Sequence, residues 1–263
     1  MTKLALLLGE GALARAAYQA AQKHFGADGV IGMALSPVHW PELPKFDLDD
    51  LPGAISETKE FGPTHICVAG RVELSPARRH QMANAVGLTE ADATSDIGVE
   101  QVFGRVAKAV GAQPIGVHQF AQDLLAGEGH LYGPVRDIVP PHISELLNVT
   151  RRFGETDIGQ AIVFAGQQPI SGEDIGGTDG LMDRVADLRR TSDLPNDLWL
   201  VKAKKPQQSG VGDLPTIGSN SIERAAKAGI SVILVEAGQT LLLDQDALGD
   251  LCDQHRVTIL GGV

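Results

Sequence analysis

The chain has 263 residues, of which 43% are hydrophobic and 21% are charged, so it can bury a core large enough for one or two globular domains. Its formal net charge of −11 disfavours DNA, RNA or an anionic membrane surface as a general partner. No apolar run approaches the roughly 18 residues of a membrane-spanning helix, and the run 4–8 ends at Gly9, which predicts a first strand rather than a signal peptide.

Strand and helix patterns alternate along the chain, which predicts an α/β fold. We expect strands at residues 4–8, 30–35, 64–69, 114–117, 161–164, 170–175, 198–201, 231–235 and 257–260. We expect helices at residues 13–25, 74–86, 96–110, 120–125, 142–152, 181–189, 219–227 and 246–255. The proline-rich segment 36–60 is expected to be irregular. Cys67 and Cys252 each lie in an apolar stretch and are expected to be buried, reduced thiols.

The first strand, a glycine loop, a helix and a second strand together predict a Rossmann-like N-terminal domain. Gly9 and Gly11 either contact the phosphate or sugar of a ligand or only permit a tight turn. A nicotinamide cofactor is disfavoured, because Ala14 replaces the third glycine of the dinucleotide fingerprint and Ser36 stands where an acidic residue is expected. Arg71 follows the third strand, where α/β sheets bind ligands, and it is either a diphosphate ligand or a surface side chain.

Heavy glycine punctuation at residues 127–134 predicts a domain boundary. We expect a Rossmann-like domain at residues 1–130 and a second α/β domain at residues 131–263.

Candidate ligand-binding side chains concentrate after the strand at residues 198–201. Lys202, Lys204 and Lys205 follow it directly, and Asp213 and Thr216 precede the start of the next helix. Free N–H groups at a helix start attract anions. A nearby carboxylate then favours a phosphate that is accompanied by a divalent metal.

Two further groups of candidate residues in the C-terminal half can be explained either by ligand binding or by a structural role. Gly176 and Gly177 precede Thr178 and Asp179, which either form an anion-binding helix start or cap the helix. Glu236 ends a strand and either contributes to a metal or water site or forms a structural salt bridge.

The stretch KPQQSGVGDLPTIGSNSIERAAKAG, residues 205–229, resembles a signature of the two-domain UDP-2,3-diacylglucosamine pyrophosphatases of the lipid A pathway. These enzymes are unrelated to the metallophosphoesterases that perform the same reaction. The resemblance continues through AGISVILVEAG, DIGQAIVF, GTDGLMDRV and GEGALA, and it therefore extends over nearly the whole chain.

The resemblance implies a Rossmann-like N-terminal domain, a C-terminal α/β domain and a lipid-sugar nucleotide bound in the cleft between them. It implies Mg²⁺-dependent hydrolysis of the diphosphate to UMP and 2,3-diacylglucosamine 1-phosphate. Asp213 matches the essential aspartate and is the expected catalytic residue, and the alternative is a structural aspartate that caps the turn at Pro215 and Thr216. The metal candidates are Asp213, Asp179 and Glu236. The substrate-binding candidates are Gly9, Gly11, Arg71, Thr178, Lys202, Lys205 and Thr216.

The chain departs from the family pattern at Ala14, Gly176, Ser209 and Val211. Two of these changes remove a carboxylate and one removes a cation. The alternative function is therefore that of a degenerate relative, which binds the acylated sugar nucleotide without turnover. The expected compartment is the cytoplasm, with peripheral contact at the inner membrane where the lipid product partitions. The sequence leaves open whether the chain forms a homodimer.

Overall fold

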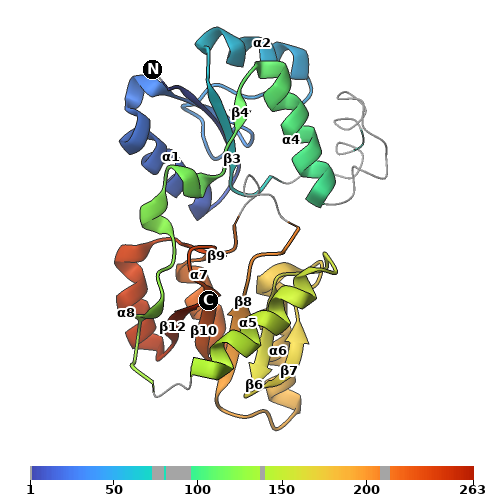
Figure 1. Cartoon of the computed structure of the whole chain (residues 1–263), viewed down its shortest axis with the longest axis vertical. Coiled ribbons are helices and arrows are strands. Elements are labelled where there is room, and N and C mark those ends of the chain that lie inside the picture. The colour runs from blue at the N-terminus through green and yellow to red at the C-terminus, as the bar shows by residue number, and fades with distance from the viewer. Residues whose placement is uncertain (1, 73–79, 81–95, 137–139, 208–213) are drawn as a thin grey trace. The chain divides into compact units, whose positions relative to one another are not determined.

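The computed structural model describes residues 2–72, 80, 96–136, 140–207 and 214–263. The chain divides into two compact units, and the described residues up to Gln122 form the first while those from Asp123 onward form the second (Figure 1). The predicted boundary after residue 130 lies inside β5 (Gly129–Tyr132), which pairs with a strand of the second unit. None of the described helices is both long and apolar enough to cross a membrane.

The first unit is a doubly wound α/β layer, as predicted. Its parallel sheet has the order β2-β1-β3-β4 and consists of β1 (Leu4–Leu8), β2 (Val30–Ala34), β3 (His65–Ala69) and β4 (Gln113–Pro114). Helix α1 (Ala12–Phe25) covers one face of this sheet. Helices α2 (Leu51–Phe61) and α4 (Asp96–Val110) pack on the other face over Ala5, Leu7 and Ile66. The order reverses between β1 and β3, so a crevice for a ligand is expected at their carboxyl ends.

Helix α2 corrects the prediction that residues 36–60 are irregular. Pro52 lies in the first turn of this helix, where its missing N–H costs nothing. The Asp50 side chain caps the helix by accepting a hydrogen bond of 3.1 Å from the N–H of Gly53. Of the predicted helix 74–86, only His80 lies within the described residues, and it is helical.

Two predictions near the end of the first unit were also wrong in type. The expected strand at 114–117 is reduced to the two residues of β4, followed by the 3₁₀ turn η3 (Val117–Gln119). The expected helix at 120–125 is another 3₁₀ turn, η4 (Gln122–Leu124). Both segments are too short for hydrophobic periodicity to separate a strand from a turn.

The second unit contains a six-stranded mixed sheet in the order β5-β12-β10-β8-β6-β7. The central strands β8 (Leu198–Lys202), β10 (Ile230–Glu236) and β12 (Thr258–Gly262) are parallel. Strands β6 (Ala161–Ala165) and β7 (Gln168–Gly172) form an antiparallel hairpin at one edge, and β5 runs antiparallel to β12 at the other. A separate short pair joins β9 (Thr216–Ile217) to β11 (Leu241–Leu242).

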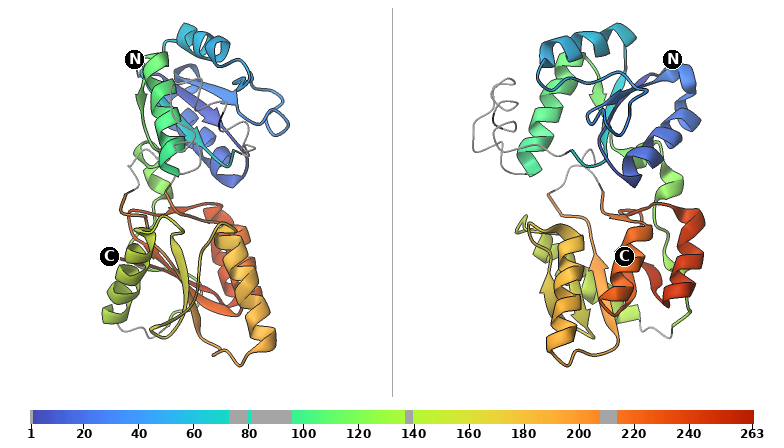
Figure 2. Two further views of the ribbon diagram at one scale, coloured as in Figure 1. Left: turned by 90° about the vertical axis from the view of Figure 1, so that its right-hand side faces the viewer. Right: turned by 180° about the vertical axis from the view of Figure 1, so that it is seen from behind.

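Helices cover both faces of this sheet, which is visible when the chain is turned by 90° (Figure 2). Helix α5 (Pro140–Gly154) is the one described helix on one face. The opposite face carries α6 (Gly177–Thr191), α7 (Ser219–Lys227) and α8 (Gln245–His255). The two faces alternate along each strand, as the pleat requires. Leu198 and Leu200 therefore face α6 and α7, whereas Val201 faces α5.

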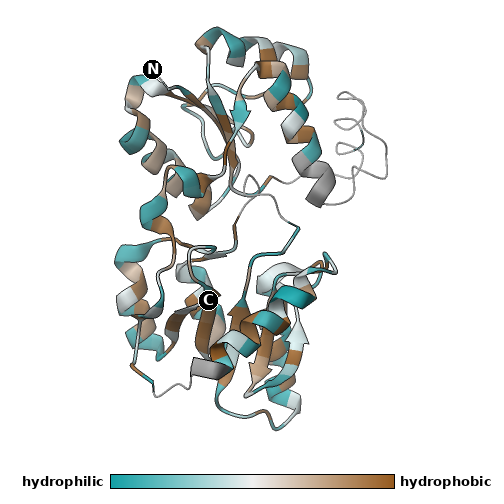
Figure 3. Ribbon diagram, viewed as in Figure 1, coloured by the Kyte–Doolittle hydropathy of each residue, from teal (hydrophilic) through white to brown (hydrophobic). Residues whose placement is uncertain are grey.

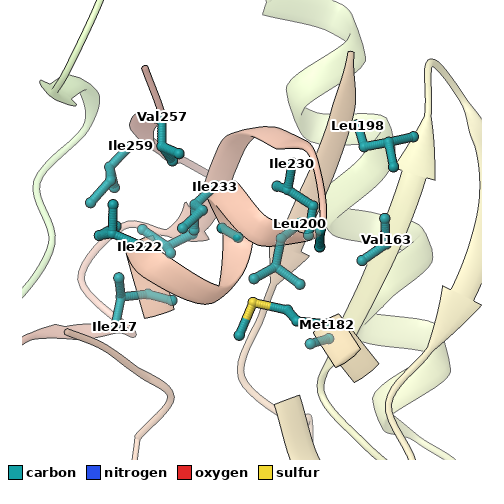
Figure 4. Close-up of a cluster of buried hydrophobic side chains, with 14 of the residues drawn as sticks. Val163, Met182, Leu198, Leu200, Ile217, Ile222, Ile230, Ile233, Val257 and Ile259 are labelled. Atoms are coloured by element: carbon teal, nitrogen blue, oxygen red, sulfur yellow. The ribbon is translucent and has the colours of Figure 1, made fainter. Parts of the chain in front are cut away.

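Apolar side chains supply the core of the second unit. Its strands are mainly hydrophobic, and its helices are hydrophilic on their outer sides (Figure 3). Branched side chains from the strands interlock with α6 and α7 in one buried cluster, which includes Val163, Leu200, Ile222 and Ile233 (Figure 4). Cys67 and Cys252 are buried free thiols, which confirms the prediction.

Candidate functional site

The charged side chains of the second unit gather where its parallel strands end. Lys202 ends β8 and Glu236 ends β10, and both lie at the carboxyl edge of the sheet. The antiparallel hairpin adds Glu173 to the same edge, because Ala161 pairs with Lys202 and accepts a 2.9 Å hydrogen bond from the N–H of Glu173. This edge is the usual ligand-binding side of an α/β sheet.

Lys202 is a deeply buried cation at this edge. It continues the alternation of Leu198 and Leu200, so its side chain faces α6 and α7 and is only 6% exposed. Its Nζ donates a hydrogen bond of 3.2 Å to the carbonyl oxygen of Thr216. Burial lowers the pKa of the Lys202 ammonium, and the opposing attraction of Glu173 and Asp179 is the smaller effect.

Glu173 occupies the space between the hairpin and α6 and is 8% exposed. Its Oε2 accepts a hydrogen bond of 2.6 Å from the backbone N–H of Gln160. Its Oε1 accepts one of 2.7 Å from the Thr178 hydroxyl, in the first turn of α6. Sequence reasoning left Glu173 out of the candidate set, although it is the side chain that joins Thr178 to the Lys202 environment.

Asp179 lies beside Thr178 in the first turn of α6 and is more exposed. Its Oδ2 accepts a hydrogen bond of 3.2 Å from the Asn220 side chain and lies 3.4 Å from Nε of Arg224. The structure thus links four predicted residues through Lys202 and Glu173. Thr178 donates to Glu173, Glu173 and Asp179 attract Lys202, and Lys202 donates to the backbone of Thr216.

Lys205 and Glu236 lie at the same edge but belong to separate ion pairs. Nζ of Lys205 is 2.9 Å from Oδ1 of Asp157. Glu236 Oε1 accepts a hydrogen bond of 3.1 Å from Nε of Arg151 and lies 3.0 Å from Nη2 in the same ion pair. Its Oε2 accepts a 2.9 Å bond from the N–H of Lys204. These contacts support the structural salt bridge that the sequence left open for Glu236.

The described carboxylates are not gathered into a cluster of metal ligands. No group of three or more His, Cys, Asp or Glu side chains gathers at metal-binding distance within the described ranges. Asp179 and Glu236, the two described metal candidates, already have nitrogen partners. Asp213, the third candidate and the expected catalytic residue, lies outside the described residues.

The glycine loop of the first unit is explained by close backbone approach. The N–H of Glu10 bonds the carbonyl of Arg71 at 2.8 Å, and the N–H of Arg71 returns a bond of 2.9 Å. A Cβ on Gly9 would collide with the carbonyl of Arg71, so only glycine fits there. Gly11 has a φ of 97° and precedes α1. The tight-turn explanation is thus sufficient for Gly9, while the Arg71 side chain lies exposed at the carboxyl ends of β1 and β3.

These features define a class: a chain of two α/β units, with charged side chains gathered at the carboxyl edge of the second sheet, as in ligand-binding α/β proteins. The family model for the LpxI C-terminal domain matches residues 141–260. The chain is also 31% identical to the UDP-2,3-diacylglucosamine pyrophosphatase LpxI of Caulobacter vibrioides, over 99% of this chain and 98% of that protein. The chain therefore belongs to the LpxI family.

Proposed function

We propose that this protein hydrolyses the diphosphate of UDP-2,3-diacylglucosamine, releasing UMP and 2,3-diacylglucosamine 1-phosphate in lipid A biosynthesis. The observation that carries the proposal is the match to the Caulobacter pyrophosphatase over almost the full length of both chains. The geometry is consistent with it, because cations and hydrogen-bonding groups gather at the edge where α/β sheets bind ligands.

Asp213 is the proposed carboxylate that binds Mg²⁺ or accepts the proton of the attacking water. When bound, Mg²⁺ would neutralise part of the diphosphate charge. Lys202 and Lys205 are the proposed cationic residues of the same site, and Thr216, which accepts the Lys202 bond, lies beside it. Contact with the inner membrane from the cytoplasmic side is part of the proposal, because the lipid product partitions there.

The test is incubation of the pure protein with UDP-2,3-diacylglucosamine and Mg²⁺, followed by measurement of UMP. We expect UMP release from the wild type and its loss in Asp213→Ala, because the metal or water then lacks its carboxylate. Asp193→Ala is a matched control, since Asp193 is an exposed aspartate in the loop between α6 and β8. Absence of release from the wild type would refute the proposal. Hydrolysis in ¹⁸O-labelled water then shows which phosphorus is attacked.

A protein that binds the acylated sugar nucleotide without turnover is the second candidate. It is favoured by the replacement of two family carboxylates by Gly176 and Ser209 and of an arginine by Val211. Mass spectrometry of lipid retained through purification, combined with absent UMP release, would establish this candidate. UMP release would exclude it.

A further inference from the structure

The fold holds the Glu173 carboxylate in one place. Glu173 directly follows β7, and its backbone N–H bonds the carbonyl of Ala161 at 2.9 Å. A Cβ on Gly159 would come within 2.6 Å of the Glu173 Cβ, so the chain leaves room for this side chain only by having glycine there. A buried carboxylate in such a confined position needs hydrogen-bond donors to compensate its lost hydration.

The two hydrogen bonds to Glu173 determine the direction in which the Thr178 hydroxyl donates its proton. A carboxylate only accepts, and Oε2 is already occupied by the N–H of Gln160. The bond of 2.7 Å at Oε1 therefore takes the single proton of the Thr178 hydroxyl. What Thr178 can offer to a ligand is then the lone pairs of Oγ1, which accept hydrogen bonds and repel phosphate oxygens.

The charged side chains around Thr178 also provide no net attraction for a phosphate. Lys202 is a buried cation, and the carboxylates of Glu173 and Asp179 attract it. Arg224 lies 3.4 Å from Asp179, so these two carboxylates already face two cations. A phosphate group therefore gains little from these side chains, whereas a neutral hydroxyl or amide N–H can donate to Thr178.

We propose that Glu173 is a positioning residue that fixes Thr178 as a hydrogen-bond acceptor, so that Thr178 binds a hydroxyl or amide N–H of the sugar nucleotide and not its phosphate oxygens. The inference rests on the proposed function for the identity of the ligand. In the sequence, Thr178 and Asp179 form a helix start that suggested anion binding. The proposed role of Thr178 is instead to accept a hydrogen bond from a neutral donor.

The Glu173→Gln variant tests the inference because it reverses the hydrogen bond between residue 173 and the Thr178 hydroxyl. The oxygen of the new amide must accept the N–H of Gln160, so its NH₂ group faces Thr178 and donates to Oγ1. The Thr178 proton then points toward the ligand. We expect KM for UDP-2,3-diacylglucosamine to rise about tenfold, as for one lost hydrogen bond, while kcat changes by less than about threefold.

A double-mutant cycle separates positioning from a general structural effect. Thr178→Val removes the acceptor and should raise KM by a similar factor, and Thr178→Ser should restore it. Glu173→Gln should have no further effect on KM in the Thr178→Val background. An undiminished KM effect in that background would overturn the inference. Asp174→Asn is the matched control, because it makes the same charge change on an exposed neighbour that bonds Gly176 and Arg184.

A binding measurement tests Glu173 independently of turnover. Inorganic phosphate titrated into each variant by calorimetry should bind Glu173→Gln at least fivefold more tightly than the wild type, because one negative charge is lost and Thr178 becomes a donor. Asp174→Asn should bind phosphate like the wild type. Equal phosphate affinity in Glu173→Gln and the wild type would overturn the inference. A wild type that releases no UMP would refute the proposed function, and the phosphate comparison would still decide the role of Glu173.

Discussion

Glu236→Gln is the substitution that best separates a structural from a chemical role at the carboxyl edge of the sheet. The Glu236 carboxylate connects the end of β10 to Arg151 in α5 and to the backbone N–H of Lys204 after β8. Its two hydrogen bonds measure 3.1 and 2.9 Å, and Nη2 of Arg151 lies 3.0 Å from Oε1. The amide of glutamine has the same size but only one accepting atom, so at least one of these donors loses its partner.

The expected cost follows from burial. Breaking a fully buried ion pair costs about 3–5 kcal/mol, and a charge-assisted hydrogen bond contributes about 1.5–3 kcal/mol. The side chains of Arg151 and Glu236 are 28% and 15% exposed, so water screens part of the interaction. We therefore expect Glu236→Gln to lower the free energy of unfolding by about 2 kcal/mol, which corresponds to a Tm lower by about 4–8 °C.

The assay can be made specific to the second unit. The chain has two tryptophans, and Trp40 lies in the first unit while Trp199 lies in β8. In a Trp40→Phe background, tryptophan fluorescence therefore reports unfolding around β8. Arg151→Met should cost a similar amount, and the double variant should cost less than the sum, because both substitutions remove the same pair.

UMP release measured on the same samples decides between the two roles. At a temperature well below Tm, Glu236→Gln should retain most of the wild-type rate. An unchanged Tm together with lost activity would refute the reasoning, because it would mean that Glu236 serves the reaction and not the fold.

The other predictions concern buried titratable groups. The pKa of Lys202 is lowered from 10.5 in the folded protein, so between the lowered value and 10.5 the unfolded chain binds a proton that the folded chain does not. The contribution of Lys202 to stability therefore rises with pH in that window. The free energy of unfolding of the wild type, measured by urea unfolding relative to Lys202→Met, should increase from pH 8 to pH 10. A difference that stays constant between these pH values would contradict the prediction. Burial raises the pKa of the Cys252 thiol to about 12. Cys252 should therefore react with a thiol reagent only as fast as the protein unfolds. Rapid labelling of the wild type at pH 8 that disappears in the Cys252→Ala variant would contradict this prediction.

The sequence by itself determined the elements with a strong local pattern. The apolar run at residues 4–8 became β1, and the helical spacing from Asp96 to Val110 became α4. The alternation of strands and helices gave the α/β class, and the ordered motifs from residues 9 to 238 gave the family that the comparisons show. These features are visible in a sequence because burial on one face or in a sheet interior imposes a period on consecutive residues.

Only the tertiary structure decided which charged groups meet. Glu173 and Lys202 become neighbours because β6 lies between β7 and β8, and their register is set by strand pairing between segments far apart in the chain. Arg151 and Glu236, which are 85 positions apart in the chain, likewise meet only because remote segments pack together. Local patterns carry no information about register, because register depends on packing between remote segments, so the polarity of Thr178 and the pairing of Glu236 could not be predicted before the fold was known.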